Sequence, residues 1–366
     1  MNIFSKESLY AVKKASEWGN VACSNYTTWY IDNNGDLYGC GYGEYGQQGN
    51  GSSGGIAGRV TAFTKRASNV AQVACSEETT WYITTSGDLY GCGQGEFGQQ
   101  GNGSSGNSNI IKTFTKRASN VAQVACSEET TWYIDTNGDL YGCGRNNKGQ
   151  QGDGTTANFV TTFTKRASNV ASVACSQYTT WYLTTSGDLY GCGEGSKYQQ
   201  GSGSTTDVKT FTKRVSSIAS SVACSQNTTW YIDYNGNLYG CGAGGSGQQG
   251  RGSTDDVIRF AKRVSNVASF ACSPNTTWYI DTNGDLYGCG EGGYGQQGND
   301  SSGSGSNGDV STFTNRASNV ASIACSEYTT WYLTTSGDLY GCGYNNYGQQ
   351  GISINTSIVK TFTKRN

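Results

Sequence analysis

Residues 79–92 read Thr-Thr-Trp-Tyr-Ile-Thr-Thr-Ser-Gly-Asp-Leu-Tyr-Gly-Cys, and close copies of this stretch occur seven times. Each copy follows an Ala-Cys-Ser motif and is followed within a few residues by Gln-Gln-Gly. Successive Ala-Cys cysteines are 52, 51, 49, 49, 48 and 53 residues apart. A period near 50 residues is typical of a supersecondary unit that buries its faces only against copies of itself. The chain therefore predicts an array of seven such units.

Each unit contains four short segments with the composition of β-strands. In the second unit they are residues 70–75, 79–84, 89–92 and 113–116, which carry β-branched and aromatic residues on both faces. An Asn-Gly or Ser-Gly dipeptide, here Ser86-Gly87, follows the second segment of every copy and predicts a two-residue hairpin turn with positive φ angles. These features predict an all-β fold, a seven-bladed β-propeller of four-stranded antiparallel blades. An open β-solenoid is the alternative.

We predict an N-terminal cap segment over residues 1–20 and a single propeller over residues 21–366. Residues 5–18 fit a capped amphipathic helix, but residues 11–16 also match the register of an outer strand, so both structures stay open. Residues 361–365 match the other outer strands better. We expect this C-terminal strand to join the first blade and close the ring.

The composition excludes several function classes. The chain has no histidine, which excludes Ser-His-Asp and Cys-His catalysis and most zinc sites. Near-identical units also rarely build one asymmetric catalytic centre. We therefore predict that the protein is not an enzyme and has no catalytic residues, no metal site and no cofactor. A net charge of −2 argues against nucleic acid as the partner.

The location of the protein is not fixed by the sequence. No apolar run approaches the roughly 20 residues of a membrane span. The N-terminus also has no uninterrupted apolar segment of the kind found in a signal peptide. A reducing cytoplasm is favoured, with a virion or extracellular particle as the alternative.

Fourteen cysteines occur as pairs 17 residues apart, one pair in each unit. The two cysteines of a pair lie on strands separated by a third strand, about 9.6 Å apart at two strand spacings. A disulfide needs Cα atoms within about 7 Å, so a bond within a blade is excluded. Buried free thiols between blades are favoured, and disulfides between blades stay open.

The stretch from Val73 to Gly103, Val-Ala-Cys-Ser to Gly-Gln-Gln-Gly-Asn-Gly, resembles the repeat of the regulator of chromosome condensation family. The resemblance extends from Val21 to Arg365. Three departures are systematic: threonine replaces the family's histidine, cysteine replaces the tryptophan before glycine, and in most copies Gly-Gln-Gln-Gly replaces Gly-Gln-Leu-Gly. The resemblance implies a seven-bladed propeller. Members of that family include exchange factors for a small GTPase, chromatin binders, ultraviolet photoreceptors and bacterial protein inhibitors, so it does not settle the function.

The antiparallel connections place the turns after Cys-Ser and the segments after Gly-Cys-Gly on one face of the propeller, and this face varies between copies. Exposed tyrosines rimmed by carboxylates are typical of protein interfaces and sugar sites. The candidate partner-binding residues are Tyr26, Tyr42, Glu44, Tyr45, Glu77, Glu78, Glu128, Glu129, Glu327, Tyr328, Tyr344 and Tyr347. The opposite face carries a nearly invariant Lys-Arg pair per unit, for which solvated charge at structural corners is favoured over a polyanion site.

These observations predict a non-enzymatic module that binds a protein partner or assembles with itself through the variable face. A glycan is a further candidate ligand. One alternative function is a structural or decoration subunit of a virion, filament or cell surface. A further alternative, carried by the family resemblance, is guanine-nucleotide exchange or chromatin-type binding.

Overall fold

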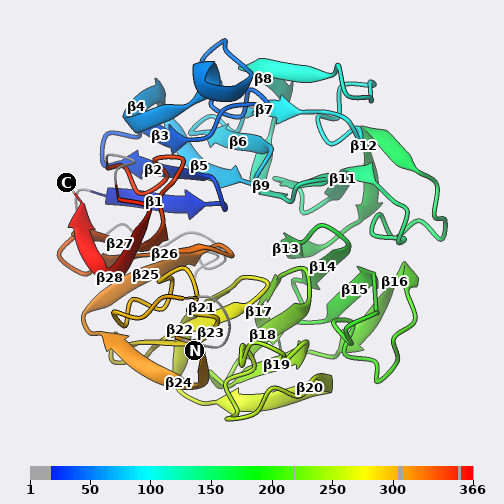
Figure 1. The fold of residues 1–366 in the computed structure, drawn as a ribbon. Helices are drawn as coiled ribbons and strands as arrows, with labels where there is room; N and C mark the ends of the chain where they lie inside the picture. The colour runs from blue at the N-terminus through cyan, green and yellow to red at the C-terminus, as the bar shows by residue number, and fades with distance from the viewer. Residues whose placement is uncertain (1–17, 218, 304–307, 353–355, 366) are drawn as a thin grey trace.

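The chain forms seven four-stranded antiparallel sheets arranged as blades around a central axis (Figure 1). The structure is a computed structural model and describes residues 18–217, 219–303, 308–352 and 356–365. The predicted seven-bladed all-β propeller is confirmed, and the open solenoid is wrong, because the first and last blades pack together. The predicted helix or strand over residues 5–18 lies outside the described residues, except for Trp18.

Each blade uses four consecutive strands, ordered from the axis outward. The strand nearest the axis is β1 (Trp18–Cys23), β5 (Val70–Cys75), β9 (Val121–Cys126), β13 (Val170–Cys175), β17 (Ala219–Cys224), β21 (Val267–Cys272) or β25 (Val320–Cys325). The second strand is β2 (Thr27–Asp32), β6 (Thr79–Thr84), β10 (Thr130–Asp135), β14 (Thr179–Thr184), β18 (Thr228–Asp233), β22 (Thr276–Asp281) or β26 (Thr329–Thr334).

The third strand is β3 (Leu37–Gly41), β7 (Leu89–Gln94), β11 (Leu140–Arg145), β15 (Leu189–Gly193), β19 (Leu238–Gly242), β23 (Leu286–Gly290) or β27 (Leu339–Tyr344). The outer strand is β4 (Val60–Ala67), β8 (Ile110–Ala118), β12 (Phe159–Ala167), β16 (Val208–Val215), β20 (Val257–Val264), β24 (Val310–Ala317) or β28 (Ile358–Arg365). In the described ranges, helix is limited to the 3-10 turn η1 (Gly55–Gly58).

The hairpin between the second and third strands differs from the predicted two-residue turn. In the first blade, Ile31 pairs with Leu37, and the Gly35 N–H donates to the Asp32 carbonyl at 3.0 Å. Of the Asn34-Gly35 pair, only the glycine has a positive φ, 77°. The Asp32 N–H donates to the Asp36 carbonyl at 3.0 Å, so the loop is residues 33–35 and ends in one left-handed glycine, a common hairpin geometry. The Asp32 carboxylate accepts hydrogen bonds from the loop N–H groups, which stabilises this longer turn.

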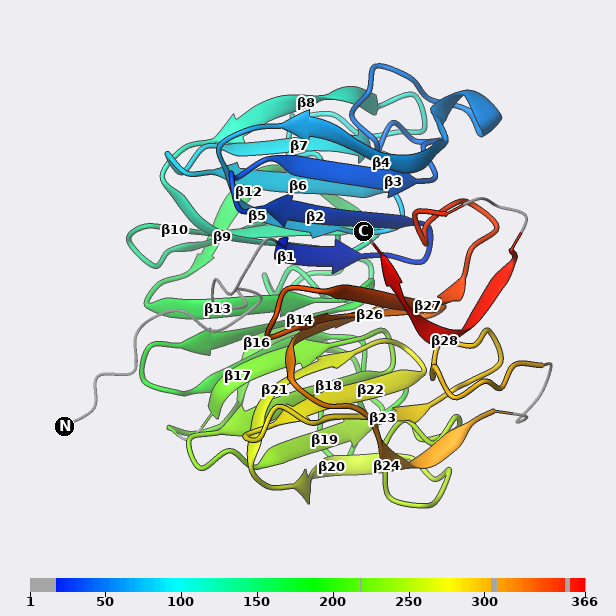
Figure 2. The same cartoon turned by 90° about the vertical axis from the view of Figure 1, so that its left-hand side faces the viewer.

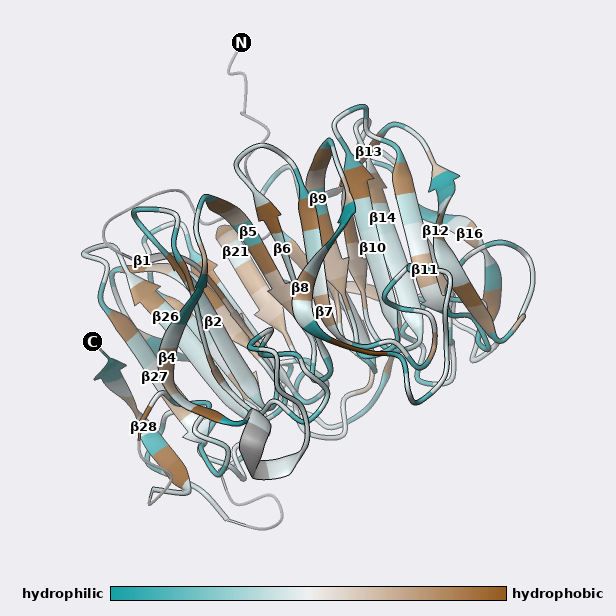
Figure 3. Cartoon of the chain, turned by 90° about the horizontal axis from the view of Figure 1, so that it is seen from above, coloured by the Kyte–Doolittle hydropathy of each residue, from teal (hydrophilic) through white to brown (hydrophobic). Residues whose placement is uncertain are grey.

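A tryptophan and a glycine face each other across the second and third strands of every blade. In the third blade, Trp132 pairs with Gly142, and a Cβ atom added to that glycine would lie 2.4 Å from the indole ring. All seven repeat tryptophans are fully buried, as expected for an inter-blade core. Each packs with apolar residues of the next blade, and apolar residues form brown bands across the strands in Figure 3.

The expected closure of the ring by the C-terminal strand is wrong. Strand β28 pairs with β27 and is the outer strand of the seventh blade, with Gly341 opposite Thr363 (Figure 2). The first blade is complete without it, because β1 begins at Trp18, inside the segment assigned to the cap, and supplies the innermost strand. Every blade is thus continuous in sequence. The ring closes by packing, as β1 contacts β25 and β26 and Trp331 packs with Val21.

The first glutamine of each Gln-Gln-Gly motif joins neighbouring blades. In the first blade, the Gln47 side-chain oxygen accepts a hydrogen bond from the Tyr45 N–H at 2.9 Å, and its amide donates to the Glu77 carbonyl of the next blade at 2.9 Å. We call this arrangement the glutamine clip. The same donation links Gln99 to Glu128, Gln150 to Gln177, Gln199 to Gln226, Gln248 to Pro274, Gln296 to Glu327 and Gln349 to Asn25. The last pair joins the seventh blade to the first.

The cysteines of the third strands contribute to the same junctions. The Cys92 thiol donates to the main-chain carbonyl of Gln47 at 3.5 Å, and the equivalent contact occurs at all seven junctions. These seven cysteines are fully buried, and all fourteen cysteines are free. The preference for free thiols over inter-blade disulfides is confirmed.

The recurrence of the clip predicts that the junction of the seventh and first blades depends on its glutamine side chain as every other junction does. Gln349→Leu leaves the Tyr347 N–H and the Asn25 carbonyl without their partner, at a cost of about 1–3 kcal/mol for each buried group. Gln199→Leu, at an internal junction, is expected to lower the free energy of unfolding by a similar amount in urea denaturation. A neutral Gln349→Leu beside a destabilising Gln199→Leu would show that other contacts close the ring.

The tryptophan–glycine pairs predict a strong sensitivity to one methyl group. Gly142→Ala forces the Trp132 ring out of its place in a packed core, which costs about 1–3 kcal/mol. Gly245→Ala is the matched control, because no atom lies within 4 Å of the added Cβ. We expect a lower thermal midpoint for the first variant and no measurable change for the second. Equal midpoints would contradict this account of the core.

Candidate partner-binding face

Seven residues, one from each blade, follow the ends of the innermost strands and lie around the propeller axis. They are Asn25, Glu77, Glu128, Gln177, Gln226, Pro274 and Glu327, and we call them the axial ring. The Asn25 amide donates to the carboxylates of Glu77 and, at 3.1 Å, Glu327. Gln226 donates to Gln177 at 3.0 Å. Side chains from blades far apart in sequence thus meet at the axis.

The carboxylates on this face are partly buried and crowd one another. Burial, followed by the charges of Glu77, Glu78, Glu129 and Glu327, raises the pKa of Glu128 to about 8. Burial, followed by the charge of Glu77, raises the pKa of Glu78 to about 7. The crowded carboxyl groups therefore repel one another when ionised, and Glu78 and Glu128 keep their protons to near-neutral pH.

At three other carboxyl groups, hydrogen bonds oppose the rise in pKa that burial causes. Burial raises the pKa values of Glu77 and Glu327, while the Asn25 amide opposes the shift at both. Burial also raises the pKa of Glu129, although this carboxylate pairs with Arg145 at 2.5 Å and accepts a hydrogen bond from Gln177.

Tyrosines of the first and seventh blades form a continuous cluster beside the axial ring. The Tyr26 ring centroid lies 5.8 Å from that of Tyr42 and 5.1 Å from that of Tyr347, and Tyr42 and Tyr347 are 5.0 Å apart. Tyr344 lies 6.1 Å from Tyr347 and 5.9 Å from Tyr328. The predicted convergence of these tyrosines at one blade junction is thus present in the structure.

One further tyrosine extends this tyrosine cluster into the sixth blade. The ring of Tyr294 lies 4.6 Å from Tyr328 and 5.7 Å from Tyr344, and the residue is 37% exposed. The sequence contained a signal for it, because Tyr294, Tyr45 and Tyr347 each precede a Gly-Gln-Gln motif. Sequence reasoning missed it by considering only the first and seventh blades.

A pocket of about 230 Å³ opens where the tyrosine cluster meets the second blade. Its lining residues are Tyr26, Tyr42, Tyr45, Glu77, Glu78 and Tyr347. Tyr45 belongs to the site through this pocket. Glu44 lies beside Tyr45 in the chain without lining the pocket, and its charge contributes to the raised pKa of Tyr45 after burial and Glu78.

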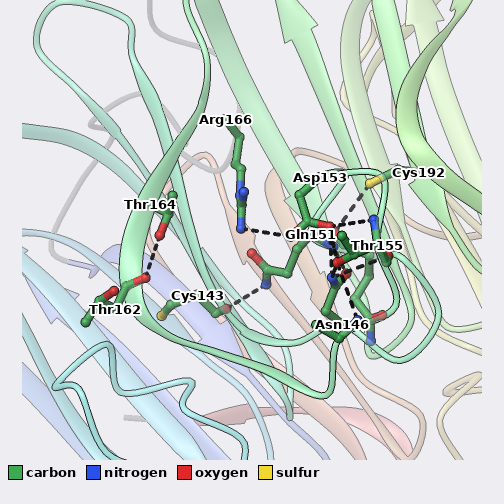
Figure 4. A network of polar contacts seen from close by, with 11 residues as sticks. Cys143, Asn146, Gln151, Asp153, Thr155, Thr162, Thr164, Arg166 and Cys192 are labelled. Carbon is green, nitrogen blue, oxygen red and sulfur yellow. Dashed lines mark hydrogen bonds and ion pairs between the residues drawn. The ribbon is translucent and has the colours of Figure 1, made fainter.

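Buried side-chain amides hold the loops that carry these residues. The equivalent loop of the third blade is drawn in Figure 4. There the Gln151 side chain donates to the Cys143 carbonyl at 2.9 Å, and the Gln151 N–H donates to Asn146 at 2.9 Å. Asn146 in turn donates to Asp153 at 3.0 Å. These contacts fix the main chain and leave the outward side chains free to differ between blades.

The opposite face carries lysines that are matched with aspartates. Lys65 pairs with Asp36 at 2.5 Å, and equivalent pairs join Lys116 to Asp88, Lys165 to Asp139, Lys213 to Asp188 and Lys364 to Asp338 at 2.6–2.8 Å. Each pair links an outer strand to the hairpin of its own blade. This arrangement supports structural corners over a polyanion site.

Three of the seven units match the family model of the regulator of chromosome condensation (RCC1) repeat, at residues 70–99, 121–150 and 320–349. The fold is similar to that of Prp20p from Saccharomyces cerevisiae, with a TM-score of 0.78 and 18% identity over 90% of this chain and 86% of that one. The protein is thus a seven-bladed propeller, three of whose blades match the RCC1 repeat.

Two curated relatives match a shorter part of this propeller. The ultraviolet-B receptor UVR8 of Arabidopsis thaliana is 33% identical over 138 residues, 37% of this chain and 31% of the receptor. The E3 ubiquitin-protein ligase HERC2 of Homo sapiens is 28% identical over 139 residues, 37% of this chain and 3% of the ligase. The match thus spans less than a third of the receptor and a small fraction of the ligase.

No helix in the described residues is long and apolar enough to cross a membrane. In the same ranges, no group of three or more Cys, Asp or Glu side chains is arranged to hold a metal ion.

The axial carboxylates predict an unusual pH dependence of stability. Because the folded-state pKa values of Glu78 and Glu128 lie above the usual value of 4.5, the folded state binds more protons than the unfolded state between about pH 5 and 8. Stability should therefore rise as the pH falls from 8 to 6. We expect the thermal midpoint of Glu128→Gln to depend less on pH than that of the unmodified chain.

A variant with an additional axial carboxylate tests whether the axial ring causes this pH dependence. Gln226→Glu adds a carboxylate to the same ring in the fifth blade, and should steepen the dependence. Since the chain has no histidine, the usual group that titrates in this range is absent. Identical pH profiles for all three proteins would contradict the assignment to the axial ring.

Proposed function

We propose that this propeller is a non-enzymatic module that binds a protein partner through its variable face. The observation that carries the proposal is the tyrosine cluster with its pocket at the junction of the seventh, first and second blades. Tyrosine supplies a large contact area at low cost in rotamer entropy and is enriched at binding hot spots.

The construction of the face supports this proposal. The glutamine clips bind main-chain carbonyls, so they fix the loop whatever side chain follows each Cys-Ser motif. Side chains therefore vary from Asn25 to Glu77 to Pro274 on one unchanged scaffold. A rigid scaffold that carries variable loops is the usual arrangement of a binding protein.

The yeast protein with the similar fold also has protein partners. Prp20p is described with binding properties to Gsp1p and histones, and yeast RCC1 (Prp20) has been solved bound to Kap60. Those partners belong to the yeast protein. For the present chain, the acidic variable face and its tyrosines suit a partner with a basic surface, and the paired lysines of the opposite face suit a supporting role.

The proposal predicts that substitution of tyrosines in the cluster weakens binding of the protein partner. Tyr45→Ala combined with Tyr347→Ala should weaken association by more than about 2 kcal/mol, the usual hot-spot threshold. Affinity capture from the source cells with the unmodified chain identifies the partner, and titration calorimetry then measures the dissociation constants. The main-chain groups that form the two clips remain, so the thermal midpoint should change little.

The matched control removes charge from the opposite face. Lys165→Gln combined with Lys213→Gln changes two exposed lysines and should leave the affinity unchanged. Loss of binding in this variant alone would move the functional surface to the lysine face. Concentration-dependent self-association that depends on the tyrosines would instead support the structural-subunit alternative.

A further inference from the structure

The pocket of the tyrosine cluster combines aromatic rings with negative charge. Tyr26, Tyr42 and Tyr347 contact one another, and Tyr45 completes the aromatic lining. Glu77 and Glu78 of the second blade line the remaining side. Its volume, about 230 Å³, is smaller than the roughly 300–1,000 Å³ of small-molecule sites. This volume suits a single side chain better than a cofactor.

The two carboxyl groups of the pocket have no cationic partner in the part of the chain that the structure describes. Among the ion pairs of the described residues, none includes Glu77 or Glu78. Both side chains are partly buried, which strengthens their interaction with any charge that enters. A cation placed here would gain two carboxylates and several ring faces at once.

The neighbouring junction shows such a cation in place. Between the second and third blades, the Arg145 guanidinium lies 4.8 Å from the centroid of the Phe97 ring and pairs with Glu129 at 2.5 Å. Phe97 occupies the repeat position of Tyr45, and Glu129 that of Glu78. At this junction, an arginine of the chain itself therefore contacts the aromatic and carboxylate side chains at these two repeat positions.

The junction of the first and second blades lacks that arginine. The repeat position of Arg145 in the second blade is Gln94, whose side chain is buried and accepts a hydrogen bond from the Gly95 N–H at 3.2 Å. The rings of the tyrosine cluster nevertheless accept a guanidinium, because Arg59 lies 5.3 Å from the centroid of Tyr347. The pocket thus has an aromatic ring and a carboxyl group equivalent to those that Arg145 contacts, but it has no equivalent of Arg145 itself.

From this comparison we propose that the pocket binds one arginine side chain of the protein partner. The guanidinium lies against the tyrosine rings and pairs with Glu77 and Glu78, as Arg145 does with Phe97 and Glu129. This inference rests on the proposed function, and it names the chemical group of the partner that the variable face recognises.

The test uses small probes of matched shape. N-acetyl-argininamide and N-acetyl-citrullinamide differ in the positive charge of the terminal group. Titration of the full chain, followed by NMR of labelled tyrosine rings, should show saturable shifts at millimolar concentrations of the arginine probe. The citrulline probe should bind at least tenfold more weakly. Equal binding of the two probes, or none by the arginine probe, overturns the inference.

Two variants locate the binding. Gln94→Arg supplies the missing internal arginine without removing any residue that lines the pocket, and should abolish the shifts while the protein stays folded. Glu78→Gln should weaken arginine binding and leave the thermal midpoint near that of the unmodified chain. Undiminished binding in both variants overturns the assignment to this pocket.

The outcome is separable from that of the proposed function. If the tyrosine variant loses its protein partner while the arginine probe does not bind, the partner-binding face stands and the arginine inference fails. If the arginine probe binds and Gln94→Arg blocks it, yet the tyrosine variant keeps its partner, the pocket assignment stands and the proposed function fails.

Discussion

The side-chain amide of one glutamine per blade holds the propeller together. Its oxygen accepts a hydrogen bond from its own loop, and its nitrogen donates to the next blade, so one buried group fixes both a loop and a junction. The thiol of the next blade's third strand donates to the main-chain carbonyl of the same glutamine. A polar group buried this deeply is stable only when fully hydrogen-bonded, which explains why the motif and the cysteine recur together.

The clip also separates stability from recognition. Its acceptor is a main-chain carbonyl, which every residue possesses, so the side chain at that position is free to serve the surface. This is why asparagine, glutamate, glutamine and proline occupy equivalent places in the axial ring. The tyrosines and carboxylates of the variable face gather without disturbing the tryptophan core beneath them.

Much of the fold could be predicted from the sequence because the repeats report the same structure seven times. The buried tryptophans and the two faces follow from strand alternation and connectivity. The closure could not be predicted, because residues 361–365 resemble every outer strand equally well. The strand that completes the first blade begins at Trp18, and only its second half, Val21-Ala22-Cys23, matches the other innermost strands. The prediction of a two-residue turn was also wrong, since the dipeptide Asn34-Gly35 does not reveal the hydrogen bonds made by Asp32.

The candidate site could be predicted only in outline. Blade adjacency brought the tyrosines of the first and seventh blades together, but the contact of Tyr294 with Tyr328 depends on how far each loop leans across a junction. The contrast between Gln94 and Arg145 acquires meaning only when both junctions are seen with their aromatic and acidic neighbours.

The continuity of each blade in the sequence has a consequence for how such a protein changes over generations. No strand is shared across the closure, so a gene segment of about 50 codons encodes one complete blade with both of its clip halves. Unequal recombination between the near-identical repeats would then insert or delete whole blades without breaking one. A family of rings with different blade numbers, and different sets of surface side chains, is thereby accessible by single genetic events.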